Sequence, residues 1–208
     1  ATLSPDESML AFAGSETDYW EMAYCNLFVY RFADQSIQKL TNYQDDDGFR
    51  LGACDGVKNI AWTPDGGSIL YDMYDDPDSS GENATAHLEI VGSDGSSSPR
   101  ILMQEEGWAF TAPQVAPTND SFILSCAISG QIFEICTAPM GLDANQTFQG
   151  TTYYGDLASA HVGHKFLPTF SADASRIIFT HQSLDGQGEI QQSFVIIDRF
   201  SAEVLEET

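Results

Sequence analysis

The chain has 208 residues and a formal net charge of -23, from 31 Asp and Glu against 8 Lys and Arg. Because a chain this acidic is repelled by nucleic acid phosphates and by anionic membranes, we expect no nucleic acid partner. Apolar residues make up 42% and charged residues only 19%, which excludes an acidic disordered tail and predicts a folded core. No apolar run approaches the roughly 18 residues that span a bilayer, and the first residues show no signal-peptide pattern.

One pattern occurs four times along the chain, in segments that align without gaps: 3–12, 62–71, 115–124 and 170–179. The anchor residues of the four copies, Ser4, Thr63, Ala116 and Ser171, are 59, 53 and 55 residues apart. In each copy an apolar residue precedes a turn rich in Ser, Pro, Asp, Asn and Gly, and a short apolar run follows. This pattern predicts a strand, a tight turn and a second strand.

Two more apolar runs follow in each repeat. The third strands are expected at 27–32, 88–91, 132–136 and 194–197, and the weaker fourth strands at 37–40, 101–103, 148–153 and 202–205. The runs are nearly continuous, which indicates sheets that are packed on both faces. No segment has helical periodicity over three turns, so we predict an all-β fold of four-stranded antiparallel sheets.

The Ser-Pro-Asp turn followed by an apolar strand, as at 4–12 and in the variant 63–71, resembles the repeat of TolB-like β-propellers. The resemblance covers all four repeats, although the third has an altered turn and the fourth lacks the Pro. It implies a β-propeller with approximate blades at 1–45, 57–103, 109–153 and 165–208, in a single propeller domain or propeller segment. It also implies an extracytoplasmic interaction platform, since such domains mostly serve as platforms and some gate serine peptidases.

The number of blades stays open at this stage. The chain is a segment of a larger propeller, a compact four-bladed ring, or a chain that completes its sheets with another copy. Before its turn the first repeat has only Ala1, Thr2 and Leu3, so the chain opens inside a strand. This favours the segment and the assembly over the self-contained ring.

Long loops are expected at one end of the sheets, at 13–25, 42–57, 72–86, 104–112, 154–165 and 181–192. Long loops on a rigid scaffold are where binding usually resides. They hold over half of the acidic residues, with aromatic residues between them, and we expect a binding face that includes Tyr19, Trp20, Tyr24, Tyr74 and Trp108. Such a face suits calcium, a basic protein patch or a glycan. The alternative is that the acids only solvate the loops.

The segment 76–82 has the D-x-D-x-S-G start of a calcium loop, with oxygen donors on Asp76, Asp78, Ser80 and Glu82. His87 stands where an EF-hand has its Glu, so the segment is not an EF-hand. A weaker second candidate contains Asp45 and Asp47, and plain polar turns are the alternative for both. His161 and His164 could share a metal with Asp156, although loop histidines without a ligand are the more common case.

The four cysteines form no C-x-x-C pair, which argues against zinc and favours disulfides. Cys25 and Cys54 end successive long loops, so they are expected to pair. Cys126 and Cys136 flank a turn at Ser129-Gly130, and a two-residue turn would pair Cys126 with Phe133, so their bridge needs a bulge or a longer turn. Buried free thiols are the alternative.

Three sequons begin at Asn83, Asn119 and Asn145 and are usable only in a secretory pathway that glycosylates asparagine. Together with the cysteines they favour an extracellular, cell-surface or periplasmic protein. There is no G-x-S-x-G nucleophile elbow, so we expect a noncatalytic structural or binding module with a protein or glycan partner, within an extracellular assembly. Self-association into an oligomer or fibre is a further expectation, and calcium is the only cofactor that we expect. The alternative is the propeller domain of a secreted hydrolase or peptidase whose catalytic domain lies outside this chain.

Overall fold

The computed structural model describes residues 1–15, 24–43, 55–75, 85–128, 132–141, 152–153 and 163–208. All regular structure in these residues is β-strand, as the sequence predicts. The described part of the chain contains no helix that is long and apolar enough to cross a membrane.

The strands form four antiparallel units of four strands each, in which consecutive strands pair. A short parallel pairing joins the first two units into one eight-stranded sheet. Unit 1 contains β1 (Thr2–Leu3), β2 (Met9–Gly14), β3 (Tyr24–Arg31) and β4 (Ser36–Lys39). Unit 2 contains β5 (Asp55–Trp62), β6 (Ser68–Asp75), β7 (Thr85–Gly92) and β8 (Arg100–Glu106). Unit 3 contains β9 (Trp108–Val115), β10 (Ser121–Ile128), β11 (Glu134–Pro139) and β12 (Thr152–Tyr153). Unit 4 contains β13 (His164–Phe170), β14 (Arg176–Leu184), β15 (Ile190–Asp198) and β16 (Val204–Glu207).

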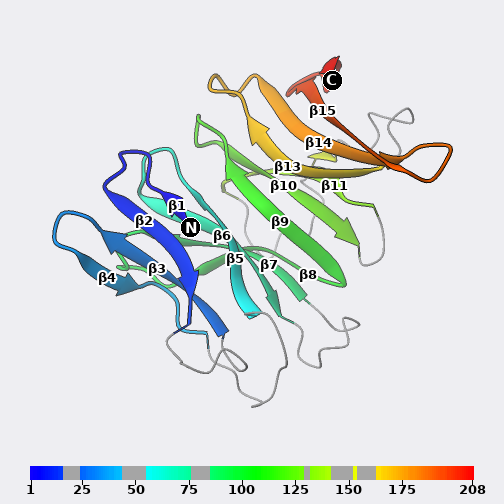
Figure 1. The fold of residues 1–208 in the computed structure, drawn as a ribbon. Helices are drawn as coiled ribbons and strands as arrows, with labels where there is room; N and C mark the ends of the chain where they lie inside the picture. The colour runs from blue at the N-terminus through cyan, green and yellow to red at the C-terminus, as the bar shows by residue number, and fades with distance from the viewer. Residues whose placement is uncertain (16–23, 44–54, 76–84, 129–131, 142–151, 154–162) are drawn as a thin grey trace.

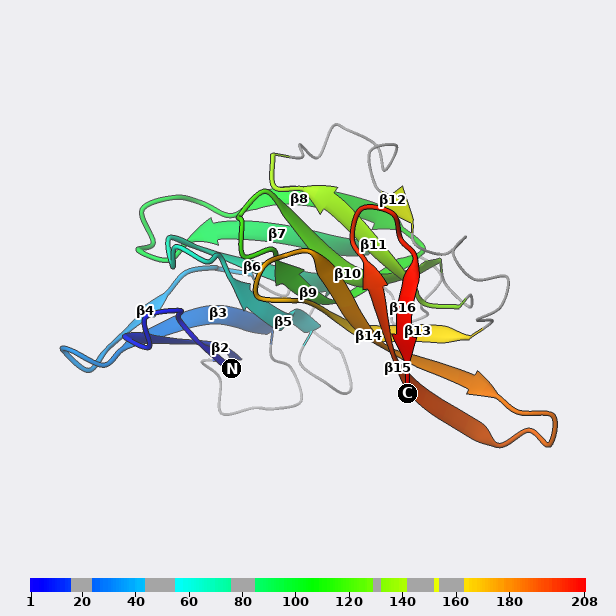
Figure 2. The ribbon, with the colours of Figure 1, turned by 90° about the horizontal axis from the view of Figure 1, so that it is seen from above.

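The four units follow one another in space in the order of the sequence, from unit 1 beside the N-terminus to unit 4 beside the C-terminus (Figure 1). The strands that pack closely across units all join consecutive units: β5 contacts unit 1, β9 contacts unit 2, and β13 contacts unit 3. Unit 1 and unit 4 lie at opposite ends of this series, and the two termini are apart in both views (Figure 2).

The tight turn that opens each repeat is held by a short hydrogen-bond network. In unit 1, the Ser4 hydroxyl donates to Asp6 at 2.7 Å and accepts the backbone N–H of Met9 at 2.9 Å. The same network forms around Asp65 in unit 2 and Asp173 in unit 4. Hydrogen bonds from the flanking Ser side chains and backbone lower the pKa of Asp6 and of Asp173 to about 2. Ser or Thr therefore recurs at the anchor position of these three units because its hydroxyl makes the hydrogen bonds that hold the turn.

The apolar core consists of three clusters, one between each pair of neighbouring units. The cluster between units 1 and 2 contains Ala11 with Ile69 and Tyr71. The cluster between units 2 and 3 contains Leu70 with Phe122 and Leu124, and that between units 3 and 4 contains Ile123 with Ile177 and Phe179. Both faces of the inner sheets are buried, which explains the nearly continuous apolar runs.

Two predicted loops are wrong. Residues 181–192 form the outer part of a hairpin, in which β14 and β15 pair as far as Leu184 with Ile190. Polar side chains at 181–183 and 191–193 suggested a loop, but backbone pairing continues beyond the core, and the Asp185 carboxylate accepts the N–H groups of Gln187 and Glu189 in the turn. Residues 104–112 are also mostly strand, because Gly107 alone, with φ 71°, separates β8 from β9.

Candidate functional site

Most of the residues that were predicted to bind calcium, to carry a glycan or to form the aromatic binding face lie outside the described residues. These are Asp76, Asp78, Ser80 and Glu82, the weaker pair Asp45 and Asp47, the sequon residues Asn83 and Asn145, and the aromatic residues Tyr19 and Trp20. Asp156 and His161 also lie outside them. Among the residues that are described, no three His, Cys, Asp or Glu side chains are grouped closely enough to hold a metal ion. The calcium sites therefore stay predictions.

Three of the predicted binding-face aromatics lie in described strands. Tyr24 opens β3 and Tyr74 lies near the end of β6, and the start of β5 pairs with both, through Asp55 and Gly56. The structure thus brings these two positions to the same end of units 1 and 2. Trp108 opens β9, where it is half-buried and its ring lies 6.1 Å from that of Phe110.

The Cys126–Cys136 disulfide is present, with a Cα–Cα distance of 6.0 Å. Strands β10 and β11 pair Leu124 with Cys136 and Cys126 with Glu134, one residue away from the register that a two-residue turn would give. Because a one-residue shift moves side chains to the other face, this register brings both cysteines to the same face. Cys25 is disulfide-bonded as well, and its expected partner Cys54 lies outside the described residues.

Asn119 lies in the turn between β9 and β10, with φ 57°. The hydroxyl of Ser121, the third residue of this sequon, donates to Asp120 at 2.8 Å and accepts a hydrogen bond from Arg199 at 2.7 Å. These bonds tie the sequon to unit 4. Glycosylation at Asn119 stays a prediction.

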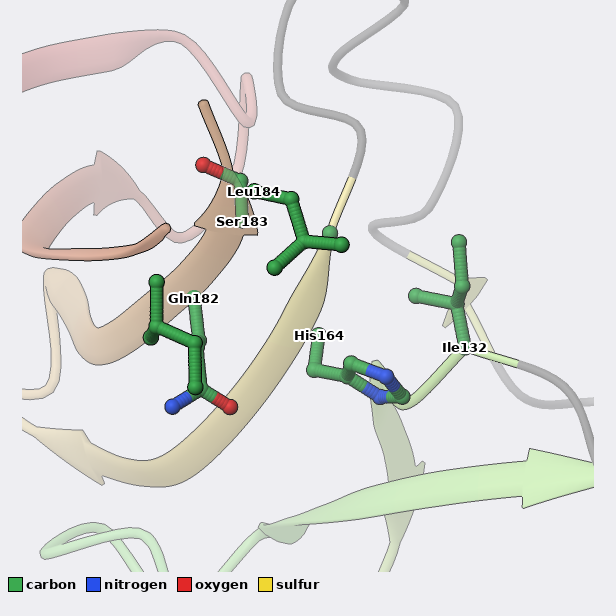
Figure 3. Close-up of a pocket in the computed structure, with 7 residues that line it drawn as sticks. Ile132, His164, Gln182, Ser183 and Leu184 are labelled. Atoms are coloured by element: carbon green, nitrogen blue, oxygen red, sulfur yellow. The ribbon is translucent and has the colours of Figure 1, made fainter. Parts of the chain in front are cut away.

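A cavity of about 490 Å³ opens on unit 4, at the end where the long loops were predicted. It is lined by Ile132 and Gly163, by His164, Gln182 and Ser183, and by Leu184 and Ile190. In Figure 3 the imidazole of His164 extends from β13 toward Ile132, and Leu184 projects from β14 beside it. A Cβ on Gly163 would collide with the Gln182 carbonyl oxygen, so glycine is required for the close approach of this segment to β14.

His164 is fixed by its neighbours. Its Nδ1 accepts the backbone N–H of Phe133 at 3.3 Å, which places the proton of the neutral imidazole on Nε2 and makes that nitrogen a hydrogen-bond donor. Its ring stacks on Phe166 at 5.5 Å. The cavity thus combines apolar walls with donors and acceptors on His164, Gln182 and Ser183.

A buried ion pair links unit 3 to unit 4. The Lys165 ammonium lies 2.6 Å from the Glu134 carboxylate, and the Lys165 side chain is only 3% exposed. The backbone N–H of Lys165 also donates to the Phe133 carbonyl oxygen at 2.9 Å. The chain segment before β11 is therefore held along β13 and keeps Ile132 at the cavity.

The cavity belongs to an exposed apolar face of unit 4. On this face Leu184 is 69% exposed, Ile190 64% and Phe194 61%. Sequence reasoning missed Leu184 and Ile190 because it placed 181–192 in a loop, and it placed Phe194 in a strand that was expected to be packed on both faces. Three consecutive polar residues separate Ile190 from Phe194, so no alternation of apolar and polar residues in the sequence could have identified this face.

A second group of polar residues is buried between units 1 and 2. The carboxylate of Glu89 accepts hydrogen bonds from Tyr43 at 2.5 Å and Tyr71 at 2.9 Å, and it lies 3.6 Å from His87. Burial opposes ionisation of Glu89, but the contacts with His87, Tyr43 and Tyr71 outweigh it and lower its pKa. Because Glu89 is only 4% exposed, this group anchors Tyr43 on unit 2 and is not a surface for ligands.

Solved structures with the same fold include the putative TolB from Agrobacterium tumefaciens, at a TM-score of 0.65 and 14% identity, which covers 99% of this chain and 63% of that one. TolB from Acinetobacter baumannii gives a TM-score of 0.60 and 15% identity over 95% of this chain and 41% of that one. The β-propeller domain of the Trilobed protease from Pyrococcus furiosus, described as having an open velcro topology, gives 0.59 and 6% identity over 97% and 54%.

No protein-family model and no curated protein sequence matches the chain. The structural likeness shows that the chain has the fold of TolB-like β-propellers, as its repeats predict. The chain spans less than two thirds of the length of the two TolB structures.

Proposed function

We propose that this protein is a noncatalytic interaction module, in which the apolar face of unit 4 and its cavity form the contact surface for a protein partner. The observation that carries this proposal is the combination of a cavity of about 490 Å³ with exposed Leu184 and Ile190 at its rim. Exposed apolar patches on soluble proteins commonly mark interaction sites. A propeller scaffold hosts many roles, so the site and not the fold supports this function.

We place the protein outside the cytoplasm, at the cell surface, in the periplasm or in the extracellular space. The Cys126–Cys136 disulfide supports this location, because disulfides persist in oxidising compartments. A glycan partner at the aromatic long-loop end and glycosylation at the three sequons remain parts of the proposal. Mass spectrometry of the native protein before and after removal of N-linked glycans tests the second.

We further propose that calcium binds at Asp76, Asp78, Ser80 and Glu82 and stabilises the long-loop end, with a weaker site at Asp45 and Asp47. Calcium that binds only the folded chain raises the melting temperature as its concentration increases. The variant Asp76→Ala with Asp78→Ala should lose this increase. An unchanged melting temperature of the parent chain in a calcium titration would contradict the site.

The alternative function is that of a propeller domain that belongs to a hydrolase or peptidase. The likeness to the propeller domain of the Trilobed protease favours it. The two functions differ in what accompanies this chain in the native protein: an α/β-hydrolase sequence beyond either end supports the enzyme, whereas further repeats support the scaffold.

A photo-crosslinking amino acid at position 190, on the cavity rim, tests the interaction module. The matched control carries the same amino acid at position 200, because Phe200 is 80% exposed and lies in the turn between β15 and β16. In the native extract we expect protein adducts from position 190 and none from position 200. Equal adducts from both positions, or none from position 190, would contradict the proposed surface.

A further inference from the structure

The cavity on unit 4 contains polar side chains that the protein itself leaves without partners. His164 accepts the backbone N–H of Phe133 at its Nδ1, but its Nε2–H has no acceptor within the part of the chain that the structure describes. The side-chain amide of Gln182 has no hydrogen bond there either. Both side chains are only partly exposed, so a ligand that covers them must supply their hydrogen-bond partners.

These two side chains lie next to each other. Strands β13 and β14 pair His164 with Gln182, and directly paired residues project from the same face of a sheet with Cβ atoms roughly 4.5–5.5 Å apart. Leu184 follows on this face two residues after Gln182 and pairs with Ile190. In Figure 3 the imidazole extends toward Ile132, with Leu184 beside it. The cavity therefore sets two adjacent polar groups among aliphatic side chains.

The two polar groups define the chemistry of the ligand. The Nε2–H of His164 requires an acceptor, whereas the amide of Gln182 both donates and accepts. A hydroxyl group satisfies both, because its oxygen accepts from His164 while its hydrogen is donated to the carbonyl oxygen of Gln182. The aliphatic walls require an apolar body that carries this hydroxyl. A phenol ring has both parts.

The charges near the cavity disfavour an anionic ligand. No described residue that lines the cavity is a Lys or an Arg, and the nearby Lys165 is paired with Glu134 and only 3% exposed. The hairpin turn at the rim carries Asp185 and Glu189, and the backbone N–H groups of Glu189 and Gln187 lower the pKa of Asp185, which keeps it ionised. A carboxylate would therefore meet negative charge, whereas basic residues beside a neutral phenol would complement the rim.

We propose that the cavity binds a tyrosine side chain of a protein partner, within a segment in which basic residues flank the tyrosine. This inference rests on the proposed function and names the group that anchors the partner. The ring packs on Ile132, Leu184 and Ile190, and the hydroxyl bonds with His164 and Gln182. Pockets of roughly 300–1,000 Å³ hold ligands of drug size. The cavity of about 490 Å³ therefore has room for the ring and the adjoining main chain.

Other apolar anchors satisfy the site less well. A phenylalanine ring fills the same space but leaves both His164 and Gln182 without partners. The indole N–H of a tryptophan only donates, so it pairs with Gln182 and leaves the Nε2–H of His164 unpaired. Because each polar group that is covered without a partner weakens binding, a preference for tyrosine over phenylalanine identifies the proposed contact.

The two hydrogen bonds of His164 can be separated by substitution. In His164→Asn the side-chain carbonyl oxygen takes the place of Nδ1 and still accepts the N–H of Phe133, but no donor reaches the place of Nε2. In His164→Gln the side-chain amide places a donor near the position of Nε2 and loses the acceptor for Phe133. The first variant removes the contact with the ligand, and the second is its matched control. Circular dichroism verifies that both fold.

The test measures the binding of three peptides by NMR titration of the methyl signals of Ile132, Leu184 and Ile190. The peptides are acetyl-Lys-Tyr-Lys-amide, acetyl-Lys-Phe-Lys-amide and acetyl-Glu-Tyr-Glu-amide. The first should bind about tenfold more tightly than the second, because the phenylalanine peptide leaves two polar groups unpaired. It should also bind more tightly than the third, and added salt should reduce this second difference. His164→Asn should remove the preference for tyrosine over phenylalanine, and His164→Gln should retain it.

Equal affinities for the tyrosine and phenylalanine peptides would overturn the inference, as would a preference that persists in His164→Asn. Methyl signals that do not shift with any of the peptides at millimolar concentration would also overturn it, and equal binding of the Lys and Glu peptides would overturn the basic flanks. In each of these cases, protein adducts from position 190 would still support the interaction module. Absence of any adduct from position 190 would contradict that function separately.

Discussion

Asn59 donates hydrogen bonds to both carboxylate oxygens of Asp72, from its backbone N–H at 2.6 Å and from its side chain at 2.9 Å. The same side-chain nitrogen donates to Thr111 of β9 at 2.9 Å, so the three residues join units 2 and 3. Asp72 is only 2% exposed. Burial raises its pKa to about 6, against an ordinary value of 3.8, and outweighs the hydrogen bonds from Asn59.

This raised pKa predicts a loss of stability with increasing pH. Between the two pKa values the folded chain binds more protons at Asp72 than the unfolded chain, so the contribution of Asp72 is largest below about pH 4 and is lost as pH rises through about 6. In Asp72→Asn this dependence disappears. Urea denaturation of both proteins from pH 4 to 7 measures it, and a constant difference in the free energy of unfolding between them would contradict it.

Asp173 should behave in the opposite way. Hydrogen bonds from Ser171 and Ser175 lower its pKa to about 2, so its stabilising contribution is present above about pH 4 and is lost as pH falls toward 2. Titration of the carboxyl carbons by NMR should therefore show Asp173 losing its charge only near pH 2, whereas Asp72 loses its charge near pH 6. Asp173 titrating near 4 would show that the turn network does not hold in solution.

The Lys165–Glu134 ion pair should contribute more to the free energy of unfolding than exposed ion pairs do. Glu134→Gln leaves a buried ammonium without its charge partner and should lower the free energy of unfolding by about 2 kcal/mol. Adding Lys165→Met removes the buried charge and should recover part of this loss. Asp120→Asn, which removes the exposed partner of Arg199, should cost less than about 1 kcal/mol. A double variant less stable than Glu134→Gln would contradict this explanation.

The Cys126–Cys136 disulfide closes a short loop, since its cysteines are 10 residues apart. Replacing both cysteines by Ala should lower the free energy of unfolding by about 2–3 kcal/mol, mainly because the unfolded chain gains conformational freedom. The fold should remain, because neighbouring strands still pair around both positions. Chemical denaturation followed by fluorescence measures the loss. Full stability in the variant would mean that the bridge does not constrain the unfolded chain.

Individual strands could be predicted from the sequence because the repeated turns and apolar runs depend on residues that lie close together in the chain. The anchors Ser4, Thr63 and Ser171 make the hydrogen bonds that close their turns. The outer part of the β14–β15 hairpin was not predictable in this way, because its pairing depends on backbone bonds between polar residues far from the core. The register at Cys126 likewise depends on the length of a turn and not on residue type.

The candidate site was less predictable than the fold. Acidic and aromatic loop residues such as Asp76 and Trp20 attracted attention by composition, and they lie outside the described residues. The cavity instead combines Ile132 from the segment before β11 with Leu184 and Ile190 from a later hairpin. Only the tertiary arrangement brings these residues together, since none of them belongs to a motif.

Photo-crosslinking from position 190 tests the central claim, that the apolar face of unit 4 and its cavity contact a protein partner. Ile190 lies on the rim of the cavity and is 64% exposed. The account predicts protein adducts from position 190 and none from position 200 in the native extract. Equal adducts from both positions, or none from position 190, would contradict it.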